Sequence, residues 1–469
     1  MREVDVFVIG AGPGGYVAAI RCGQLGLKTL VAEREWLGGV CNWVGCIPSK
    51  ALISASKLYR KAHEASEIGI TFTGAQLDWG KLQAWKRQVT KKLSDGVGGL
   101  LKGNKVDLLM GTAKLTGKNS AEVRSGDGKV EQVRFKSCIL AAGSAPIEIP
   151  GFKPDGKRII TSTEALELPG VPKRLVIIGA GAIGLEIACF YRNFGSHVTV
   201  VELMPQVLPG TDGEVAKTLH RYLTKRGIEV HLEAKAKSAT ASATGVKVEF
   251  EAGGKPHVVE ADHCLVAVGR RALTQALGLD AAGIQLHEKG WVRVNERLQT
   301  NVQHVYAIGD LVGPPQLAHK ASKEGLVAAE VIAGKKGAMR DFVTVPGVIF
   351  TDPEVATAGL SEEDARKANH DVGVGKFPFT ASGRALTAME TEGFAKVVFD
   401  KKTRLVLGVH IVGPEASDLI SEAALALEMG ATVEDLAWTV HPHPTLGEAL
   451  CEAAEDAEGL GIHTLKRAA

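Results

Sequence analysis

Residues 4–15 decide the fold, and they read Val4-Asp5-Val6-Phe7-Val8-Ile9-Gly10-Ala11-Gly12-Pro13-Gly14-Gly15. The apolar run is typical of a buried parallel strand, and the glycine-rich turn opens an apolar helix that we expect to run through Leu25. Gly10 suits the tight turn, Gly12 lets the backbone approach a pyrophosphate, and Gly15 lets helix and sheet pack closely. The stretch therefore predicts a dinucleotide site at the positive end of the helix.

An acidic residue completes this first signature. The next predicted strand, residues 28–32, ends on Glu33, which lies 18 positions after Gly15. A carboxylate at this distance can accept hydrogen bonds from the ribose hydroxyls of a dinucleotide.

The whole pattern recurs in the middle of the chain. A strand at 174–178 leads into Gly179-Ala180-Gly181-Ala182-Ile183-Gly184, and a second strand at 197–201 ends on Glu202, again 18 positions after the last glycine. The duplication predicts two dinucleotides bound at once. Glu202 would repel a 2′-phosphate, and no arginine follows it immediately, so NAD is favoured over NADP.

Two cysteines lie just downstream of the first signature, in Gly38-Gly39-Val40-Cys41-Asn42-Trp43-Val44-Gly45-Cys46-Ile47-Pro48-Ser49-Lys50. In a regular helix a separation of five residues would place the two Cα atoms roughly 7.5 Å apart. A disulfide needs about 4.4–6.8 Å. We therefore expect a bent backbone between Cys41 and Cys46, and a strained, accessible and readily reduced bridge.

Composition excludes several other classes of function. The 469 residues carry 55 Lys and Arg against 53 Asp and Glu, a net charge of +2 without a long basic run, which disfavours binding to nucleic acid or to an anionic membrane. No apolar run approaches the length of a membrane span and no signal-peptide core opens the chain, so we expect neither membrane insertion nor secretion.

The other cysteines support a location in the cytoplasm. Seven cysteines are an odd number and, apart from one pair, are scattered, which argues against a secreted disulfide framework. We expect the remaining five to be small buried side chains: Cys22, Cys138, Cys189, Cys264 and Cys451. In a reducing compartment a surviving bridge is usually catalytic.

The rest of the chain suggests its domain organisation. Strands ending in small-residue turns at 138–144 and 305–310 look like returns to the first nucleotide domain, and 265–270 closes the second. After residue 342 strands at 397–399 and 406–412 alternate with helices near 415–429 and 446–457, without a glycine signature. We predict an α/β protein with two Rossmann-like domains, at 1–148 with a return segment at 272–342 and at 149–271, and a C-terminal α+β domain at 343–469.

These motifs together resemble those of the pyridine nucleotide-disulfide oxidoreductases, the disulfide-dependent flavoprotein reductases. The resemblance covers essentially the whole chain and rests on Gly10–Gly15, Cys41–Lys50, Gly179–Gly184 with Glu186 and Glu202, Tyr306–Asp310, Leu317–Ala321 and His441–Glu448. It implies FAD in the first site, NAD in the second, and a homodimer formed through the C-terminal domain.

The resemblance also implies which residues bind the cofactors. For FAD these are Gly10, Gly12, Pro13, Gly14, Gly15, Glu33, Arg34, Gly39, Val40, Cys41, Lys50, Ala113, Ala142, Gly143, Ser144, Gly309, Asp310, Gln316, Leu317, Ala318 and His319. For NAD they are Gly179, Gly181, Ala182, Ile183, Gly184, Glu202 and Gly269.

The implied reaction is the oxidation of dihydrolipoyl groups with NAD. Cys41 would exchange with the substrate dithiol and Cys46 would face the flavin, beside an ion pair of Lys50 and Glu186. His443 would serve as the base for the partner subunit's disulfide, held by Glu448, while His441 would be structural. No lipoyl module precedes the first strand, so we expect the lipoyl group on another protein, in a 2-oxo acid dehydrogenase complex or the glycine cleavage system.

Two departures and several alternatives accompany this interpretation. The family usually has Leu-Asn-Val-Gly between the cysteines and Ala-Thr-Gly at the turn, where this chain has Asn42-Trp43-Val44-Gly45 and Ala141-Ala142-Gly143. Glutathione-type reductases would use NADP, mercuric reductases would carry a C-terminal cysteine pair, soluble transhydrogenases would lack the intact pair, and a scaffold flavoprotein would not turn over. Histidine spacing does not suit a zinc site.

Overall fold

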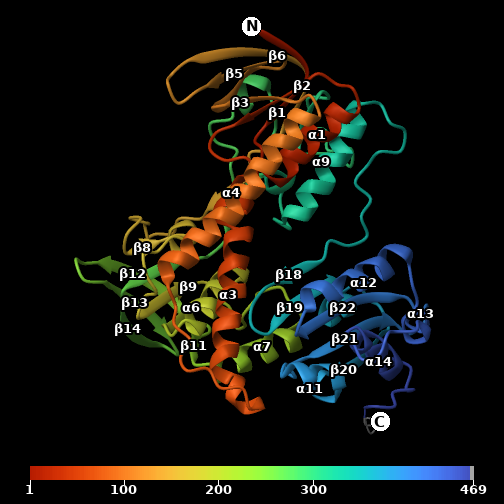
Figure 1. Cartoon of the computed structure of the whole chain (residues 1–469). Helices are drawn as coiled ribbons and strands as arrows, with labels where there is room; N and C mark the ends of the chain where they lie inside the picture. The colour runs from red at the N-terminus through yellow and green to blue at the C-terminus, as the bar shows by residue number, and fades with distance from the viewer. Residues whose placement is uncertain (465–469) are drawn as a thin grey trace. The chain divides into compact units, whose positions relative to one another are not determined.

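A computed structural model describes residues 1–464, and residues 465–469, which end the predicted C-terminal domain, lie outside the described residues. The chain divides into two compact units (Figure 1). The first comprises Met1–Leu52, Asp78–Ile147 and Gly269–Asp341, and the second Ile53–Leu77, Glu148–Val268 and Phe342–Ala469. The division falls within one helix, between Leu52 and Ile53.

The first unit is built on a sheet with a parallel core, in the order β3-β2-β1-β6 with β17 also paired to β6. One half of the long strand β6 pairs with β17 and the other half with the antiparallel β5. The strands are β1 (Arg2–Ile9), β2 (Thr29–Glu33), β3 (Asp107–Met110), β4 (Thr112–Gly117), β5 (Ser120–Arg124), β6 (Val130–Leu140), β7 (Ser144–Pro146), β16 (Arg270–Ala272) and β17 (Val305–Ala307). The predicted return at 138–144 therefore lies beside the first strand, and the return at 305–310 lies beside residues 138–140 in the same sheet.

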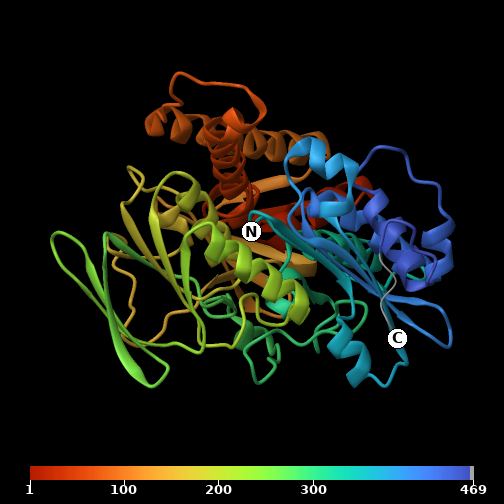
Figure 2. The same ribbon diagram turned by 90° about the horizontal axis from the view of Figure 1, so that it is seen from below.

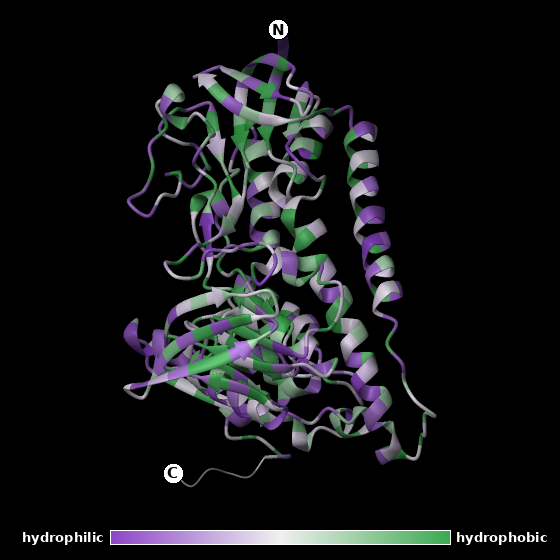
Figure 3. Cartoon of the chain, turned by 90° about the vertical axis from the view of Figure 1, so that its left-hand side faces the viewer, coloured by the Kyte–Doolittle hydropathy of each residue, from purple (hydrophilic) through white to green (hydrophobic). Residues whose placement is uncertain are grey.

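The helices of this unit are α1 (Pro13–Gln24), α2 (Gly39–Val44), the start of α3 (Cys46–Glu64), α4 (Trp79–Gly103), α8 (Leu279–Ala282), η2 (Gly309–Val312) and α9 (Ala318–Ile332). Helix α1 packs along α9, and both bury their apolar faces against the parallel strands. Strand β2 and the second half of β1 are continuously buried because they are covered on both faces. Green hydrophobic residues accordingly run through the sheet at the N-terminal end in Figure 3.

The nucleotide sheet of the second unit repeats this order with β11-β10-β9-β15-β8, in which every pair is parallel. A three-stranded antiparallel sheet, β12-β13-β14, accompanies it, and one of its hairpins is the green projection at the left of Figure 2. The elements are η1 (Ala65–Ile68), β8 (Ile159–Ile160), α5 (Ser162–Ala165), β9 (Arg174–Ile178), α6 (Ala182–Asn193), β10 (His197–Val201), α7 (Gly213–Lys225), β11 (Ile228–His231), β12 (Lys235–Ala241), β13 (Val246–Ala252), β14 (Lys255–Ala261) and β15 (His263–Val266). The predicted duplication is thus visible strand by strand.

The C-terminal part of the second unit is an antiparallel sheet in the order β18-β19-β22-β21-β20. Helix α12 packs on β19 and β22, and α14 on β20 and β21 (Figure 1). The elements are β18 (Gly347–Ile349), β19 (Glu354–Gly359), α10 (Glu362–Lys367), β20 (Val372–Pro378), η3 (Phe379–Ala381), α11 (Gly383–Ala388), β21 (Phe394–Asp400), β22 (Val406–Gly413), α12 (Ala416–Met429), α13 (Val433–Trp438) and α14 (Glu448–Ala457). The two predicted helices are confirmed, and α13 lies between them.

Candidate active site

Two glycine turns shape the two nucleotide folds in the same way. Gly10 has φ +101° and Gly179 has φ +104°, in the left-handed region that only glycine enters easily. A Cβ at Gly179 would lie 2.6 Å from the carbonyl oxygen of Ala267. A Cβ at Gly10 would overlap the carbonyl oxygen of Ala141. Both positions require glycine for the predicted reason, since the turn brings two backbones into contact.

The helix N-termini behind these turns are open. Gly12 is the N-cap of α1 and Gly181 the N-cap of α6, and neither helix has a side-chain cap. A Cβ built at either glycine would meet no atom within 4 Å. Each cradle therefore leaves room in front of backbone N–H groups at the positive end of a 12-residue helix, which suits a pyrophosphate.

The two acidic residues are held in matching positions. Glu33 Oε2 accepts a hydrogen bond of 2.7 Å from the Ala11 N–H, and Glu202 Oε2 accepts one of 2.7 Å from the Ala180 N–H. The other oxygens accept from the N–H groups of Glu35 and Met204. Both carboxylates are buried at the ends of strands, so each is fixed beside its glycine turn.

The cysteine pair lies at a break between two helices. Helix α2 ends at Val44, Gly45 leaves the helical conformation with φ −143° and ψ −111°, and α3 begins at Cys46. The bend predicted from the spacing is therefore present. The structure holds the pair as thiols in hydrogen-bond contact, and this hydrogen bond together with burial raises the pKa of Cys41.

Cys46 occupies the better place for a thiolate. It is the first residue of the 19-residue helix α3, where the helix dipole stabilises a negative charge. Lys50 follows one turn later on the same helix, and its charge acts on the Cys41 thiol to lower its pKa, against the larger effects of burial and Cys46. The two thiols therefore differ in position, since Cys41 lies within α2 whereas Cys46 begins α3.

The two unusual residues between the cysteines have defined surroundings. Asn42 is buried, and its Nδ2 donates to the carbonyl oxygens of Thr90 on α4, at 3.2 Å, and of Leu37, at 3.4 Å. The Trp43 ring stacks on Trp36 with centroids 6.4 Å apart. The departures from the family pattern therefore attach α2 to its neighbours and leave both thiols in place.

Asp310 lies in a polar cluster that the sequence did not reveal. Ser144 donates its hydroxyl to the Asp310 carboxylate, while Arg270 donates to the Ser144 hydroxyl at 2.8 Å and to its carbonyl oxygen at 2.7 Å. Burial lowers the pKa of Arg270, against the charge of Asp310. No spacing in the sequence links positions 144, 270 and 310, because β7, β16 and η2, which carry them, meet only in the folded chain.

A buried ion pair supports the same segment from α9. Glu324 Oε2 accepts 2.7 Å from the Gly309 N–H, and Lys320 Nζ lies 3.1 Å from Glu324 Oε1. Both side chains are buried. The spacing of four residues between Lys320 and Glu324 is typical of an ion pair on a helix. The sequence did not show that this ion pair is buried.

The other predicted FAD contacts are distributed through the first unit. Gly39 begins α2, Ala113 is buried on β4, Ala142 and Gly143 follow β6, and Leu317 is the N-cap of α9. These positions, with Arg34, Val40, Gln316, Ala318 and His319, stay predictions. Gly269 also belongs to the first unit, whereas the other predicted NAD contacts belong to the second.

Glu186 is fixed within the second unit. It is buried on α6, and its Oε1 accepts a 3.0 Å hydrogen bond from the Phe350 N–H. Lys50 belongs to the first unit, so the ion pair expected between the two stays a prediction.

His443 has the geometry of an oriented base. Its Nδ1 lies 2.8 Å from Glu448 Oε1, and the imidazole is 79% exposed in the single chain. Although burial opposes it, hydrogen bonds from the Thr445 N–H and from His443 hold the pKa of Glu448 below its usual value. His441 is hydrogen-bonded at both ring nitrogens, to Thr439 and Glu422, as suits a structural residue.

Four of the remaining cysteines, Cys22, Cys138, Cys189 and Cys264, are buried as predicted, and burial raises the pKa of each thiol. Cys451 departs from the prediction, because it is only partly buried on α14. The position of Cys451 in a predicted helix could not show that its face of α14 is incompletely covered within one chain.

Two adjoining thiols, in a chain with two dinucleotide sites, can transfer electron pairs between sulfur and a nicotinamide. This combination defines a nucleotide-dependent disulfide oxidoreductase. The chain belongs to the pyridine nucleotide-disulphide oxidoreductase family, whose model matches residues 4–325, and the dimerisation domain of that family matches residues 345–454.

Several known proteins similar to this chain over its whole length are named dihydrolipoyl dehydrogenase. It is 48% identical to a dihydrolipoyl dehydrogenase of Geobacillus stearothermophilus over 99% of this chain and 98% of the relative. It is 51% identical to a dihydrolipoyl dehydrogenase of Thermus scotoductus over 100% of both chains. The crystal structure of LpdA from Mycobacterium tuberculosis has a TM-score of 0.90 at 27% identity, covering 97% of this chain and 99% of that one.

The chain is therefore an FAD-dependent, NAD-linked disulfide oxidoreductase with a C-terminal dimerisation domain. Within residues 1–464 no helix is long and apolar enough to cross a membrane.

Proposed function

We propose that this enzyme oxidises protein-bound dihydrolipoyl groups to lipoyl groups with reduction of NAD. The observation that carries the proposal is the pair of adjoining thiols at the break between α2 and α3, with Cys46 at the start of α3. A dithiol substrate needs such a pair, because two successive thiol–disulfide exchanges convert it to a cyclic disulfide. The relatives named dihydrolipoyl dehydrogenase, matched over their full length, support the choice of substrate.

The proposed first step is deprotonation of a substrate thiol by His443, which Glu448 orients through Nδ1. The thiolate attacks the Cys41 sulfur of the oxidised pair, the Cys41–Cys46 bond breaks, and Cys46 leaves as a thiolate at the helix N-terminus. The second substrate thiol then attacks the mixed disulfide, and Cys41 leaves as the substrate closes its own disulfide. Two electrons now reside on the protein dithiol.

FAD, when bound, carries this electron pair from the dithiol to NAD. The residues that would hold it are the Gly10–Gly15 turn with Glu33, and Asp310 with Ser144, for which the open cradle at Gly12 and the fixed carboxylates are suited. The Gly179–Gly184 turn and Glu202 would hold NAD, and the buried charge of Glu202 disfavours a 2′-phosphate. Lys50 and Glu186 would flank the flavin.

The base would serve a second copy of the chain. The C-terminal domain exposes large apolar side chains near His443, with Trp438 77% and Val440 94% exposed in the single chain. An isologous dimer would bury them and would deliver His443 to the partner's thiol pair. The lipoyl groups would come from 2-oxo acid dehydrogenase complexes or the glycine cleavage system, in the cytoplasm.

Steady-state oxidation of free dihydrolipoamide, with NAD compared to NADP, tests the proposal. We expect turnover with NAD and weak activity with NADP. Preference for NADP, or reaction only with glutathione disulfide or mercuric ion, would contradict the substrate assignment. Bound FAD without any disulfide-linked turnover would indicate a scaffold instead. His443→Gln should slow dithiol oxidation severely while retaining FAD.

A further inference from the structure

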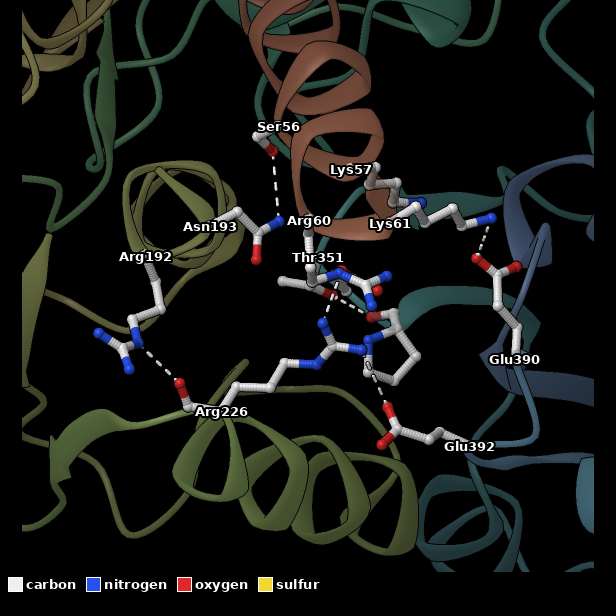
Figure 4. A network of polar contacts seen from close by, with 12 residues as sticks. Ser56, Lys57, Arg60, Lys61, Arg192, Asn193, Arg226, Thr351, Glu390 and Glu392 are labelled. Carbon is white, nitrogen blue, oxygen red and sulfur yellow. Dashed lines mark hydrogen bonds and ion pairs between the residues drawn. The ribbon is translucent and has the colours of Figure 1, made fainter. Parts of the chain in front are cut away.

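A network of charged side chains surrounds residues 350–354, which lead from β18 into β19 within the second unit (Figure 4). Arg226 Nη1 lies 2.8 Å from Asp352 Oδ2, and Arg60 Nε lies 3.1 Å from the same oxygen. Arg226 Nη2 also reaches Glu392 Oε2 at 3.2 Å. The network thus joins helix α3, the end of α7 and the C-terminal sheet, although no step of the proposed reaction uses its charges.

Burial makes this network energetically demanding. Asp352 has only 10% of its side chain exposed, and the two arginines 16% and 20%. Burial lowers the pKa of Arg226, but Asp352 and Glu392 more than compensate and raise it. Because a buried charge that loses its partner is costly, each member fixes the position of the others.

Neighbouring contacts hold the rest of the segment. Lys57 Nζ lies 3.0 Å from Glu354 Oε1, and Glu354 Oε2 accepts 3.1 Å from the Ser417 N–H. The Thr351 hydroxyl donates to the Pro353 carbonyl oxygen at 2.7 Å. Residues 351–354 are therefore restrained by side chains from several elements.

The backbone of the same segment is bound to one face of α6. The Phe350 N–H donates to Glu186 Oε1 at 3.0 Å. One helical turn further on, the Asp352 backbone acts on the Cys189 thiol to lower its pKa, against the larger effect of burial. At the next turn Asn193 Nδ2 donates to Ser56 Oγ at 3.3 Å. Residues 186, 189 and 193 share a face because they are three and four positions apart.

We propose that Asp352 and Arg226 are positioning residues for Glu186. The ion pair holds residues 350–352 against α6, the Phe350 N–H thereby fixes one oxygen of the Glu186 carboxylate, and the orientation of that carboxylate toward the flavin follows. The inference rests on the proposed function, from which it takes the place of Glu186 beside FAD. A carboxylate with one anchored oxygen keeps its charge in one position, whereas a loosened segment would let it rotate.

The test is a double-mutant cycle on the FAD-loaded enzyme, with Arg226→Met and Asp352→Asn made in the native and the Glu186→Gln backgrounds. The readouts are the midpoint potential of the bound FAD and the rate of its reduction by NADH. In the native background we expect a potential shift in the same direction as that of Glu186→Gln and a rate about threefold to tenfold lower, as for one weakened hydrogen bond. In the Glu186→Gln background, the shift in potential and the loss of rate should each be less than half of their size in the native background.

Lys61→Met is the matched control. It removes a 2.7 Å ion pair to Glu390 from the same helix, but Lys61 contacts no residue of the 350–354 segment in the network shown in Figure 4. We expect native potential and rate in this variant. Arg226→Lys, which keeps the cation, should retain most of the native values, and thermal unfolding followed on all variants separates loss of stability from loss of positioning.

Two results would overturn the inference, and they can be told apart. Equal effects of Arg226→Met in both backgrounds would mean that the network acts independently of Glu186, while the proposed function stands. A Glu186→Gln enzyme with native potential and rate would remove Glu186 from the flavin site, and the positioning role with it.

Discussion

The contact between His443 and Glu448 allows a graded prediction for the proposed base. Glu448 accepts hydrogen bonds from His443 Nδ1 and from the Thr445 N–H, both at 2.8 Å. Glu448→Gln keeps an acceptor of the same size but removes the charge. A hydrogen bond to a charged group contributes about 1.5–3 kcal/mol and a neutral one about 0.5–1.5 kcal/mol, so the loss is about 1–1.5 kcal/mol. We expect kcat/KM for dihydrolipoamide to fall about tenfold.

Glu448→Ala removes both hydrogen bonds and should cost about another tenfold. The assay is NADH production at several dithiol concentrations, with thermal unfolding and the visible FAD spectrum as controls for folding. Because Glu448 lies at the start of α14, near the surface, we expect neither control to change much. If Gln and Ala variants both stay within twofold of the native enzyme, Glu448 does not orient the base.

Three further predictions address the cradles and the interior. Gly12→Ala should leave the fold intact, because its Cβ would meet no atom within 4 Å, but should weaken FAD retention measured by gel filtration and absorbance; Gly181→Ala is the paired variant for NAD. Glu202→Gln should raise the ratio of NADP to NAD turnover, and an unchanged ratio would contradict its role in excluding the 2′-phosphate. Lys396→Met should lower the free energy of unfolding by about 3–5 kcal/mol in urea titrations, since it leaves the buried Asp212, 3.0 Å from Nζ, without its cation. Although burial opposes it, Lys396 holds the pKa of Asp212 below its usual value, so this stabilisation is present above about pH 3.9 and is lost as pH falls through the lowered pKa. The acid unfolding midpoint should therefore rise in Lys396→Met, and an unchanged midpoint would refute the assignment.

Local patterns predicted the nucleotide folds well. The turns at Gly10 and Gly179 and the acids Glu33 and Glu202 follow from chemistry confined to one strand, one turn and one helix. The bend at Gly45 could also be inferred, because two cysteines five positions apart cannot meet on a straight helix.

Contacts between segments far apart in the sequence could not be predicted from local patterns. Ser144 with Arg270 and Asp310, and Arg226 with Asp352 and Glu392, join residues more than 120 positions apart. Nothing near Arg226 in the sequence distinguishes it from an ordinary surface arginine at the end of a helix. Its partner is chosen by how α7 packs on the C-terminal sheet.

The sequence by itself determined which groups can react and that two dinucleotides can bind, because glycine conformation, thiol chemistry and carboxylate spacing act over a few residues. Only the tertiary structure decided which charges are buried, which carboxylate oxygens are anchored and which thiol begins a helix next to its partner. Burial and long-range pairing depend on the packing of whole elements, and that information is spread over the chain.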